Sequence, residues 1–301
     1  MLVRIIPFVF LTALLVSVTG QAQVKLQTVS PEMTGTGITQ IHTPHLIATP
    51  AAAQDRHQLL VMIPGTGGNA DCVPFRIFDS SFAAMGYYVV TLDYPNNVIT
   101  TICSKSEDST CFDHFRQEIM FGTPVSDKVA VDTINSLVNR LTKLLQYMAA
   151  KDVRWKAFVT KGQPRWDKII AAGHSQGAGH AAYMGKQFKL RGVLLFSGPQ
   201  DYLVYFNMPS RWQRESGRTP VNRYYAFLHV RDPFNFNYQV ADVTAINHQQ
   251  ATDTTMVQPH MTVRSTRHIL VTDTDKSEPH GSTLGLQFLP VWRYMITGAG
   301  R

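Results

Sequence analysis

Residues 166–182 read WDKIIAAGHSQGAGHAA, and the order of residue types in this stretch decides the fold. A short apolar run at 169–172 leads directly into GHSQG at 173–177, which has the pattern G-x-S-x-G. This pattern predicts a sharp turn from strand to helix, with Ser175 at the apex and its hydroxyl clear of the sheet. The two glycines suit such a turn because a side chain at either place would collide with the neighbouring strand or helix.

The residues that follow the turn are small, which predicts a helix packed closely against the sheet. They are Ala178, Gly179, Ala181 and Ala182. A G-x-S-x-G pentapeptide alone arises by chance in many chains, and the alternative here is a tight turn that happens to contain serine. A buried strand before it and a small-residue helix after it make the pattern specific.

This stretch resembles the nucleophile elbow of the α/β-hydrolase superfamily, most closely that of secreted bacterial esterase and lipase-like members. The resemblance extends from about residue 59 to the C-terminus as an order of strands and motifs. It implies an α/β fold with a mostly parallel eight-stranded sheet and helices on both faces. It also implies a triad of serine, acid and histidine in that chain order.

The expected elements follow from apolar runs and helical periodicity along the chain. The strands expected are residues 38–41, 45–48, 57–63, 87–94, 169–172, 192–196, 224–230 and 268–272. Besides the helix after the turn, the helices expected are residues 74–85, 128–151 and 284–296, with a weak helical segment within 235–260. Residues 95–126 are expected to form a long polar insert.

The first 22 residues have the pattern of a secretory signal peptide. Arg4 precedes an apolar run at 5–18, and Gly20 and Ala22 supply the small residues that a signal peptidase requires. The run is shorter than the 18 or more residues of a membrane span, although a retained anchor helix is the alternative. We therefore expect a secreted or periplasmic protein without a stable membrane anchor, in which residues 23–301 form a single domain.

Composition narrows the class of partner. The chain has 301 residues, of which 44% are hydrophobic and 16% charged. This hydrophobic content is enough for a sizeable core. Its formal net charge is +7, but no run of Lys and Arg is concentrated enough to indicate a nucleic-acid partner. The sequence does not indicate an oligomeric state.

Three cysteines in an exported chain predict one disulfide and one free thiol. We expect Cys103 and Cys111 to pair across a short polar loop, which leaves Cys72 free and partly buried. A pair that includes Cys72 is the alternative, because its loop and the polar insert follow adjacent strands.

The turn PGTGGN at 64–69 follows the third expected strand. The resemblance places one oxyanion donor in this turn, where a bare backbone lets an N–H reach the developing negative charge. By position the backbone N–H of Thr66 is the expected donor, paired with that of Gln176. A flexible loop is the alternative, and a phosphate-binding loop is not indicated because its lysine is absent.

The resemblance places the triad acid after the seventh strand and the histidine after the eighth, where Asp232 and His280 occur. Asp201, after the sixth strand, is the alternative acid, and is otherwise expected to be a turn acceptor. The alternatives for Asp232 and His280 are an ordinary turn residue and a solvent-exposed loop histidine. His174 is expected to support the turn, and His180 to pack on the following helix.

These residue types predict nucleophilic catalysis, because a serine hydroxyl attacks only when an imidazole takes its proton and a carboxylate holds the imidazole in the right tautomer. The expected function is a secreted serine hydrolase of carboxylic esters, with a small or polymeric ester as substrate. Peptide, amide or thioester cleavage by the same triad is an alternative, as is a catalytically silent binding protein. No cofactor and no metal is expected, since the acidic residues at 273–278 lack the spacing of a calcium loop.

Overall fold

A computed structural model describes residues 24–249, 253–274 and 277–300, and the expected signal segment lies outside them. Its centre is a sheet whose nine described strands run in the order β1-β2-β4-β3-β7-β8-β11-β13-β12. All neighbouring strands from β4 to β12 are parallel, whereas β1 with β2 and β2 with β4 are antiparallel. The expected mostly parallel sheet is thereby confirmed.

Seven of the eight expected strands lie within three residues of the observed bounds. The strands of the sheet are β1 (Lys25–Val29), β2 (His45–Thr49), β3 (Leu59–Ile63), β4 (Tyr88–Thr91), β7 (Ile169–His174), β8 (Gly192–Phe196), β11 (Tyr224–His229), β12 (Thr254–Met256) and β13 (Ile269–Thr272). The edge strand β12 brings the sheet to nine strands, one more than expected. Two small hairpins lie outside it, β5 (Val159–Thr160) with β6 (Gln163–Pro164) and β9 (Tyr202–Leu203) with β10 (Met208–Pro209).

The expectation of a strand at 38–41 is wrong. The edge strand is β1, which pairs with β2 over its whole length. Ile38 is buried, but its neighbours Thr39 and Gln40 donate their backbone N–H groups to the Asn135 side chain instead of to a strand. The buried apolar side chain of Ile38 therefore gave the sequence pattern of a strand, although the segment is a loop held by the Asn135 side chain.

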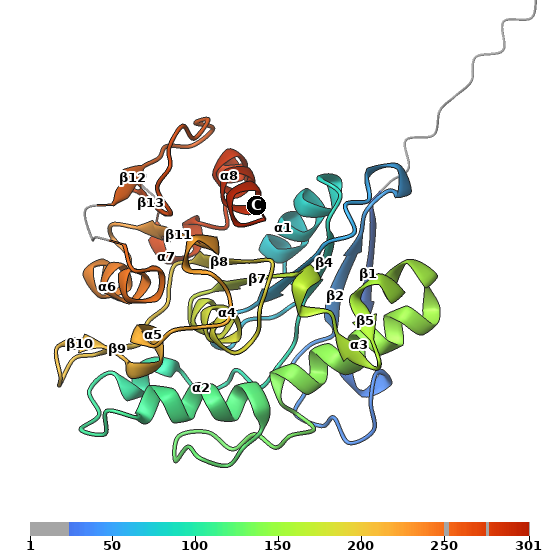
Figure 1. Ribbon diagram of the computed structural model, residues 1–301, viewed down its shortest axis with the longest axis horizontal. Helices are drawn as coiled ribbons and strands as arrows, with labels where there is room; N and C mark the ends of the chain where they lie inside the picture. The colour runs from blue at the N-terminus through green and yellow to red at the C-terminus, as the bar shows by residue number, and fades with distance from the viewer. Residues whose placement is uncertain (1–23, 250–252, 275–276, 301) are drawn as a thin grey trace, which may run out of the picture.

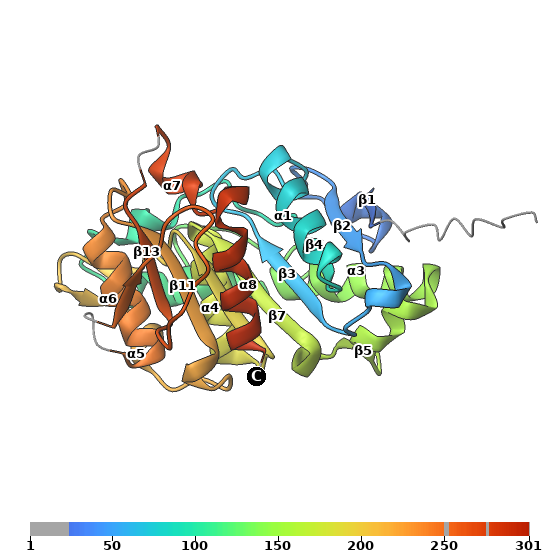
Figure 2. The ribbon, with the colours of Figure 1, turned by 90° about the horizontal axis from the view of Figure 1, so that it is seen from above.

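Helices cover both faces of the sheet (Figure 1). One face carries α1 (Val73–Ala84) and α8 (Leu289–Ala299), and the other carries α2 (Cys111–Phe121), α3 (Leu137–Lys151), α4 (Gln176–Gln187) and α6 (Phe236–Asn247). Each face has its own cluster of buried apolar side chains. Two short helices remain, α5 (Arg211–Arg214) and α7 (Pro279–Ser282), and α7 projects beyond the end of β13 (Figure 2).

The region between β4 and β7 departs most from expectation. The supposed polar insert contains α2, and the following helix begins at Leu137 rather than at 128. Glu118 of α2 accepts hydrogen bonds from the backbone N–H groups of residues 125, 126 and 131, which holds the intervening chain in an irregular loop. Ser136 then caps α3 by accepting from the N–H of Asn139.

The structure contains the expected disulfide between Cys103 and Cys111, and Cys72 is free and half-buried. The bridge joins a short 3₁₀ turn to the first residue of α2. Among the residues that the structure describes, no helix is both long and apolar enough to span a lipid bilayer.

A fully buried ion pair fastens α3 to the end of β4. Arg140 donates to the Asp93 carboxylate at 2.8 Å, and its other N–H groups bond to Asn135 and to the Gln40 carbonyl. Asp93 also accepts from the backbone N–H of Thr43. The pair therefore holds the loop before β2 against the core.

Removing the cation from this pair should destabilise the protein strongly. For Arg140→Leu we expect the free energy of unfolding to fall by about 3–5 kcal/mol, because the buried carboxylate of Asp93 loses its partner. The control is Arg154→Leu, whose pair with Asp152 lies at the surface and should contribute less than about 1 kcal/mol. Urea denaturation measures both, and equal losses would contradict the burial argument.

Candidate active site

The turn at Ser175 has the strained geometry that the sequence predicts. β7 ends at His174, Ser175 adopts φ 58° and ψ −126°, and α4 begins at the next residue. Side chains rarely occupy this left-handed region, so the neighbours must hold the serine there. A Cβ on Gly173 would lie 2.0 Å from the carbonyl oxygen of Gly177, and one on Gly177 2.0 Å from that of Ile63. Only glycine fits at these two places.

His280 and Asp232 meet at the carboxyl ends of two adjacent parallel strands. Asp232 follows β11, His280 lies in α7 after β13, and Nδ1 of His280 is 2.7 Å from Oδ2 of Asp232. The carboxylate is buried, whereas the imidazole is 19% exposed. A carboxylate only accepts, so Nδ1 of His280 donates to it, and in the neutral imidazole Nε2 is then the acceptor.

Opposing effects act on the Asp232 carboxyl, and the net result is a lowered pKa. Burial is the largest of them and would raise the pKa, since it disfavours the charged form. The hydrogen bond and charge of His280, with the backbone N–H of Phe234 at 2.9 Å, outweigh it. Asp232 is therefore held as a carboxylate beside the imidazole.

The alternative acid, Asp201, is engaged elsewhere. Its carboxylate accepts from Arg116 at 2.5 and 2.9 Å and from the indole N–H of Trp212 at 3.0 Å. Both members of the ion pair are fully buried. The expectation that Asp201 is only a turn acceptor is wrong, because its carboxylate balances a buried cation on α2.

The hydroxyl of Ser175 lies against a residue that the sequence did not single out. The side-chain amide of Gln200, in the loop after β8, donates to Ser175 Oγ at 3.2 Å. Within the described residues no hydrogen bond joins Ser175 Oγ directly to the ring of His280. Gln200 has no motif of its own, and its place after the sixth expected strand is the only sequence signal that points to it.

The carbonyl oxygen of His280 is held against the turn by two donors. His174 Nε2 lies 3.0 Å from it, and the Ser197 hydroxyl donates to it at 2.7 Å. Burial, followed by the nearby His280, lowers the pKa of His174 to about 4. His174 is thus a neutral donor. Its hydrogen bond joins α7, which carries His280, to the end of β7 directly before Ser175.

His180, one helical turn after Ser175, is fully buried on α4. Its ring lies edge-on to Tyr94. Burial and the charge of Arg116 lower its pKa well below the usual range. It packs on the helix, as expected.

The turn after β3 lies directly beside the serine. A Cβ on Gly65 would lie 2.9 Å from the Cβ of Ser175, so the bare backbone of Gly65 lets the turn approach the serine one residue before the expected donor Thr66. The Thr66 hydroxyl and the backbone N–H of Thr100 both donate to the side-chain oxygen of Gln176, at 2.7 and 2.9 Å. No described hydrogen bond occupies the backbone N–H of Thr66 or Gln176. Both groups therefore remain available to a ligand.

Comparison with known proteins finds no matching family model and no matching curated protein. Among solved structures, a candidate dienelactone hydrolase of Klebsiella pneumoniae is 11% identical, with a TM-score of 0.48 over 92% of this chain and 99% of that chain. The α/β hydrolase MGS-M1 from a Medee basin deep-sea metagenome library is 12% identical, with a TM-score of 0.46 over 93% and 100%. Thermogutta terrifontis esterase 2 is 11% identical, with a TM-score of 0.47 over 91% and 95%.

These likenesses are too distant to carry an argument about activity. The fold rests instead on the strand order of the sheet and on the strained serine between β7 and α4. The chain has the α/β-hydrolase fold. In this fold, ligands bind outside the carboxyl ends of the parallel strands, where Ser175, Asp232 and His280 lie.

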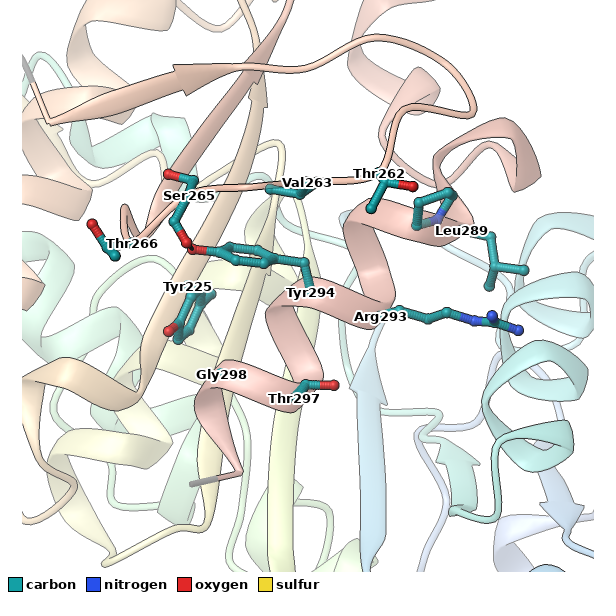
Figure 3. Close-up of a pocket in the computed structure, with 11 residues that line it drawn as sticks. Tyr225, Thr262, Val263, Ser265, Thr266, Leu289, Arg293, Tyr294, Thr297 and Gly298 are labelled. Atoms are coloured by element: carbon teal, nitrogen blue, oxygen red, sulfur yellow. Dashed lines mark hydrogen bonds between the residues drawn. The ribbon is translucent and has the colours of Figure 1, made fainter.

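A sizeable cavity lies elsewhere on this α/β-hydrolase fold. It measures about 620 Å³ and lies between α8 and the segment that precedes β13. Figure 3 shows Tyr225 and Tyr294 in its wall and Arg293 pointing away from them. The cavity includes none of the candidate catalytic residues. The described residues also contain no cluster of three His, Cys, Asp or Glu side chains placed to hold a metal ion.

The two candidate acids should differ in their effect on stability. Asp201→Asn leaves the buried charge of Arg116 without its counter-ion, so the free energy of unfolding should fall by about 3–5 kcal/mol. Asp232→Asn should cost about 1–3 kcal/mol, because it weakens one hydrogen bond to a charged group but leaves no buried cation without a partner. Urea denaturation at pH 7.5 measures both, and a loss below about 1 kcal/mol for Asp201→Asn would contradict the role of its ion pair.

The lowered pKa of His174 predicts a loss of stability in acid. An unfolded histidine binds a proton near pH 6.5, whereas the folded one does so only near about 4. This contribution is complete above pH 6.5 and decreases by up to about 1.4 kcal/mol per pH unit as the pH falls toward 4. His174→Gln keeps a donor and removes the titration, so its unfolding free energy should depend less on pH between 6.5 and 4. Identical slopes in urea titrations of the two proteins would disprove this assignment.

Proposed function

We propose that this protein is a serine hydrolase that cleaves carboxylic esters through an acyl-enzyme intermediate. The observation that supports this most directly is the 2.7 Å hydrogen bond between His280 and Asp232. It lies at the edge of the sheet where Ser175 stands in its strained turn, and His174 ties the two parts together. The three residues proposed as nucleophile, base and orienting acid are thus within one small region, which supports a role in acyl transfer.

In the acylation step, Ser175 Oγ attacks the ester carbonyl while Nε2 of His280 takes the hydroxyl proton. The Asp232 carboxylate stabilises the imidazolium that forms and holds the ring in place. The backbone N–H groups of Thr66 and Gln176 bind the negative charge on the carbonyl oxygen. The imidazolium then gives its proton to the departing alcohol, which leaves an acyl group on Ser175.

Deacylation repeats these steps with water as the nucleophile. His280 takes a proton from water, the new tetrahedral intermediate uses the same two N–H donors, and Ser175 leaves with the proton that His280 returns. No cofactor takes part in this scheme. The substrate is a small or polymeric ester.

Acyl compounds other than esters are the second class of substrate to test. Peptide, amide and thioester bonds are open to attack by the same residues, and a silent binding protein would keep the fold without turnover. Esters are proposed because the stretch around Ser175 is most similar to the elbow of esterase and lipase-like proteins. The Cys103–Cys111 disulfide favours an oxidising compartment, and with the expected signal segment it supports export to the periplasm or beyond.

The decisive experiment combines covalent labelling with turnover. A fluorophosphonate should modify Ser175, and p-nitrophenyl esters of increasing acyl length should be hydrolysed, with both reactions absent in Ser175→Ala. Asp232→Asn should lower kcat about 10⁴-fold, because the amide favours the wrong tautomer of His280. Asp201→Asn, assayed where it is fully folded, should lose less than Asp232→Asn, because Asp201 supports the site without touching His280. Absence of labelling in the folded wild type would remove the enzyme proposal, and turnover of thioesters or amides alone would change the substrate class.

A further inference from the structure

The side-chain amide of Gln200 contacts the reacting atom of the proposed nucleophile. Its Nε2 lies 3.2 Å from Ser175 Oγ, and both residues are almost fully buried, with 5% and 7% of their surface exposed. An amide nitrogen can only donate, so Oγ accepts this hydrogen bond through a lone pair. The hydroxyl proton of Ser175 is therefore left for another acceptor.

Gln200 is held in place from both sides. Before it, the Ser197 hydroxyl bonds to the His280 carbonyl and to Thr283 Oγ1. After it, Asp201 is fixed by the buried guanidinium of Arg116 and by the indole of Trp212. The loop after β8 thus has one anchor on α7 and one on α2. A side chain between two such anchors loses little entropy when it contacts the serine.

The positions of hydrogen-bond donors and acceptors in the site give this contact a chemical role. Asp232 keeps the His280 proton on Nδ1, so His280 Nε2 is an acceptor that can receive the hydroxyl proton. The amide of Gln200 has no such capacity. As the proton leaves Oγ, negative charge develops beside Nε2 of Gln200, and a donor already in place stabilises that charge without reorganising.

We propose that Gln200 is a further catalytic residue, which binds Ser175 Oγ whenever that oxygen carries negative charge; this rests on the proposed function of Ser175. In acylation the Oγ–H bond breaks, the proton moves to His280 Nε2, and Oγ bonds to the acyl carbon. In deacylation the bond from Oγ to the acyl carbon breaks and the proton returns from His280. Gln200 keeps its own protons throughout and stabilises Oγ as attacking and as leaving atom.

Two variants of similar shape test this proposal. Gln200→Met removes the donor and retains the length of the side chain. It should slow fluorophosphonate labelling of Ser175 and lower kcat for p-nitrophenyl esters by about 10- to 100-fold, the usual effect of one hydrogen bond to a charged group. Gln200→Glu should lose more at pH 8, because an ionised carboxylate only accepts and would draw the hydroxyl proton away from His280.

The controls separate this proposal from the proposed function. Gln146→Ala removes a glutamine amide that bonds the Gly162 carbonyl far from the site, and should react as the wild type does. If Ser175→Ala abolishes labelling but Gln200→Met and Gln200→Glu label within threefold of the wild type, only the role of Gln200 is overturned. A rise in KM with unchanged labelling would also overturn it, because Gln200 would then bind substrate instead of the nucleophile. The melting temperature shows whether each variant is folded, and one folded Gln200 variant is enough for the comparison.

Discussion

The buried ion pair between Arg116 and Asp201 is the interaction on which the candidate site depends. Two charges without solvent are costly, and such a pair persists only where further hydrogen bonds satisfy both groups. Here Arg116 also donates to the Gln176 carbonyl at 2.8 Å, and Asp201 also accepts from Trp212. One guanidinium thereby connects α2, the loop after β8 and the first turn of α4. That turn carries one proposed oxyanion donor, and the loop carries Gln200.

This ion pair also explains a small residue in the elbow helix. The sequence suggests that Gly179 lets α4 approach the sheet, but a Cβ there would lie 2.0 Å from the guanidinium of Arg116. Gly173 and Gly177 do serve the close approach of strand and helix. Glycine spacing alone therefore predicts that room is needed, but not which group fills it.

Local patterns predicted most of the sheet, because buried parallel strands are continuous apolar runs that need no knowledge of their partners. Helix α2 escaped prediction because its charged residues Asp113, Arg116 and Glu118 are buried, which hides its helical periodicity. The partners of Asp113 and Arg116 lie in distant segments, at Arg211 and Asp201. Glu118 instead binds the backbone of the loop directly after α2. A hydropathy pattern assigns such residues to the surface, so the fold of this insert depends on contacts that no local window contains.

The same limit applies to the site. The order of strands and loops identified Ser175 and His280 as candidates and placed Asp232 ahead of Asp201 as the acid, but it could not show that Asp201 pairs with a buried arginine.

The sequence predicts that His174 supports the turn, and its burial has a further consequence for the electrostatics of the site. The ring of His174 lies 4.9 Å from that of His280, where a second positive charge would oppose the imidazolium of the proposed acyl transfer. Burial keeps His174 uncharged, so its ring adds no positive charge beside His280. His174 can therefore anchor α7 without weakening the proposed base, His280.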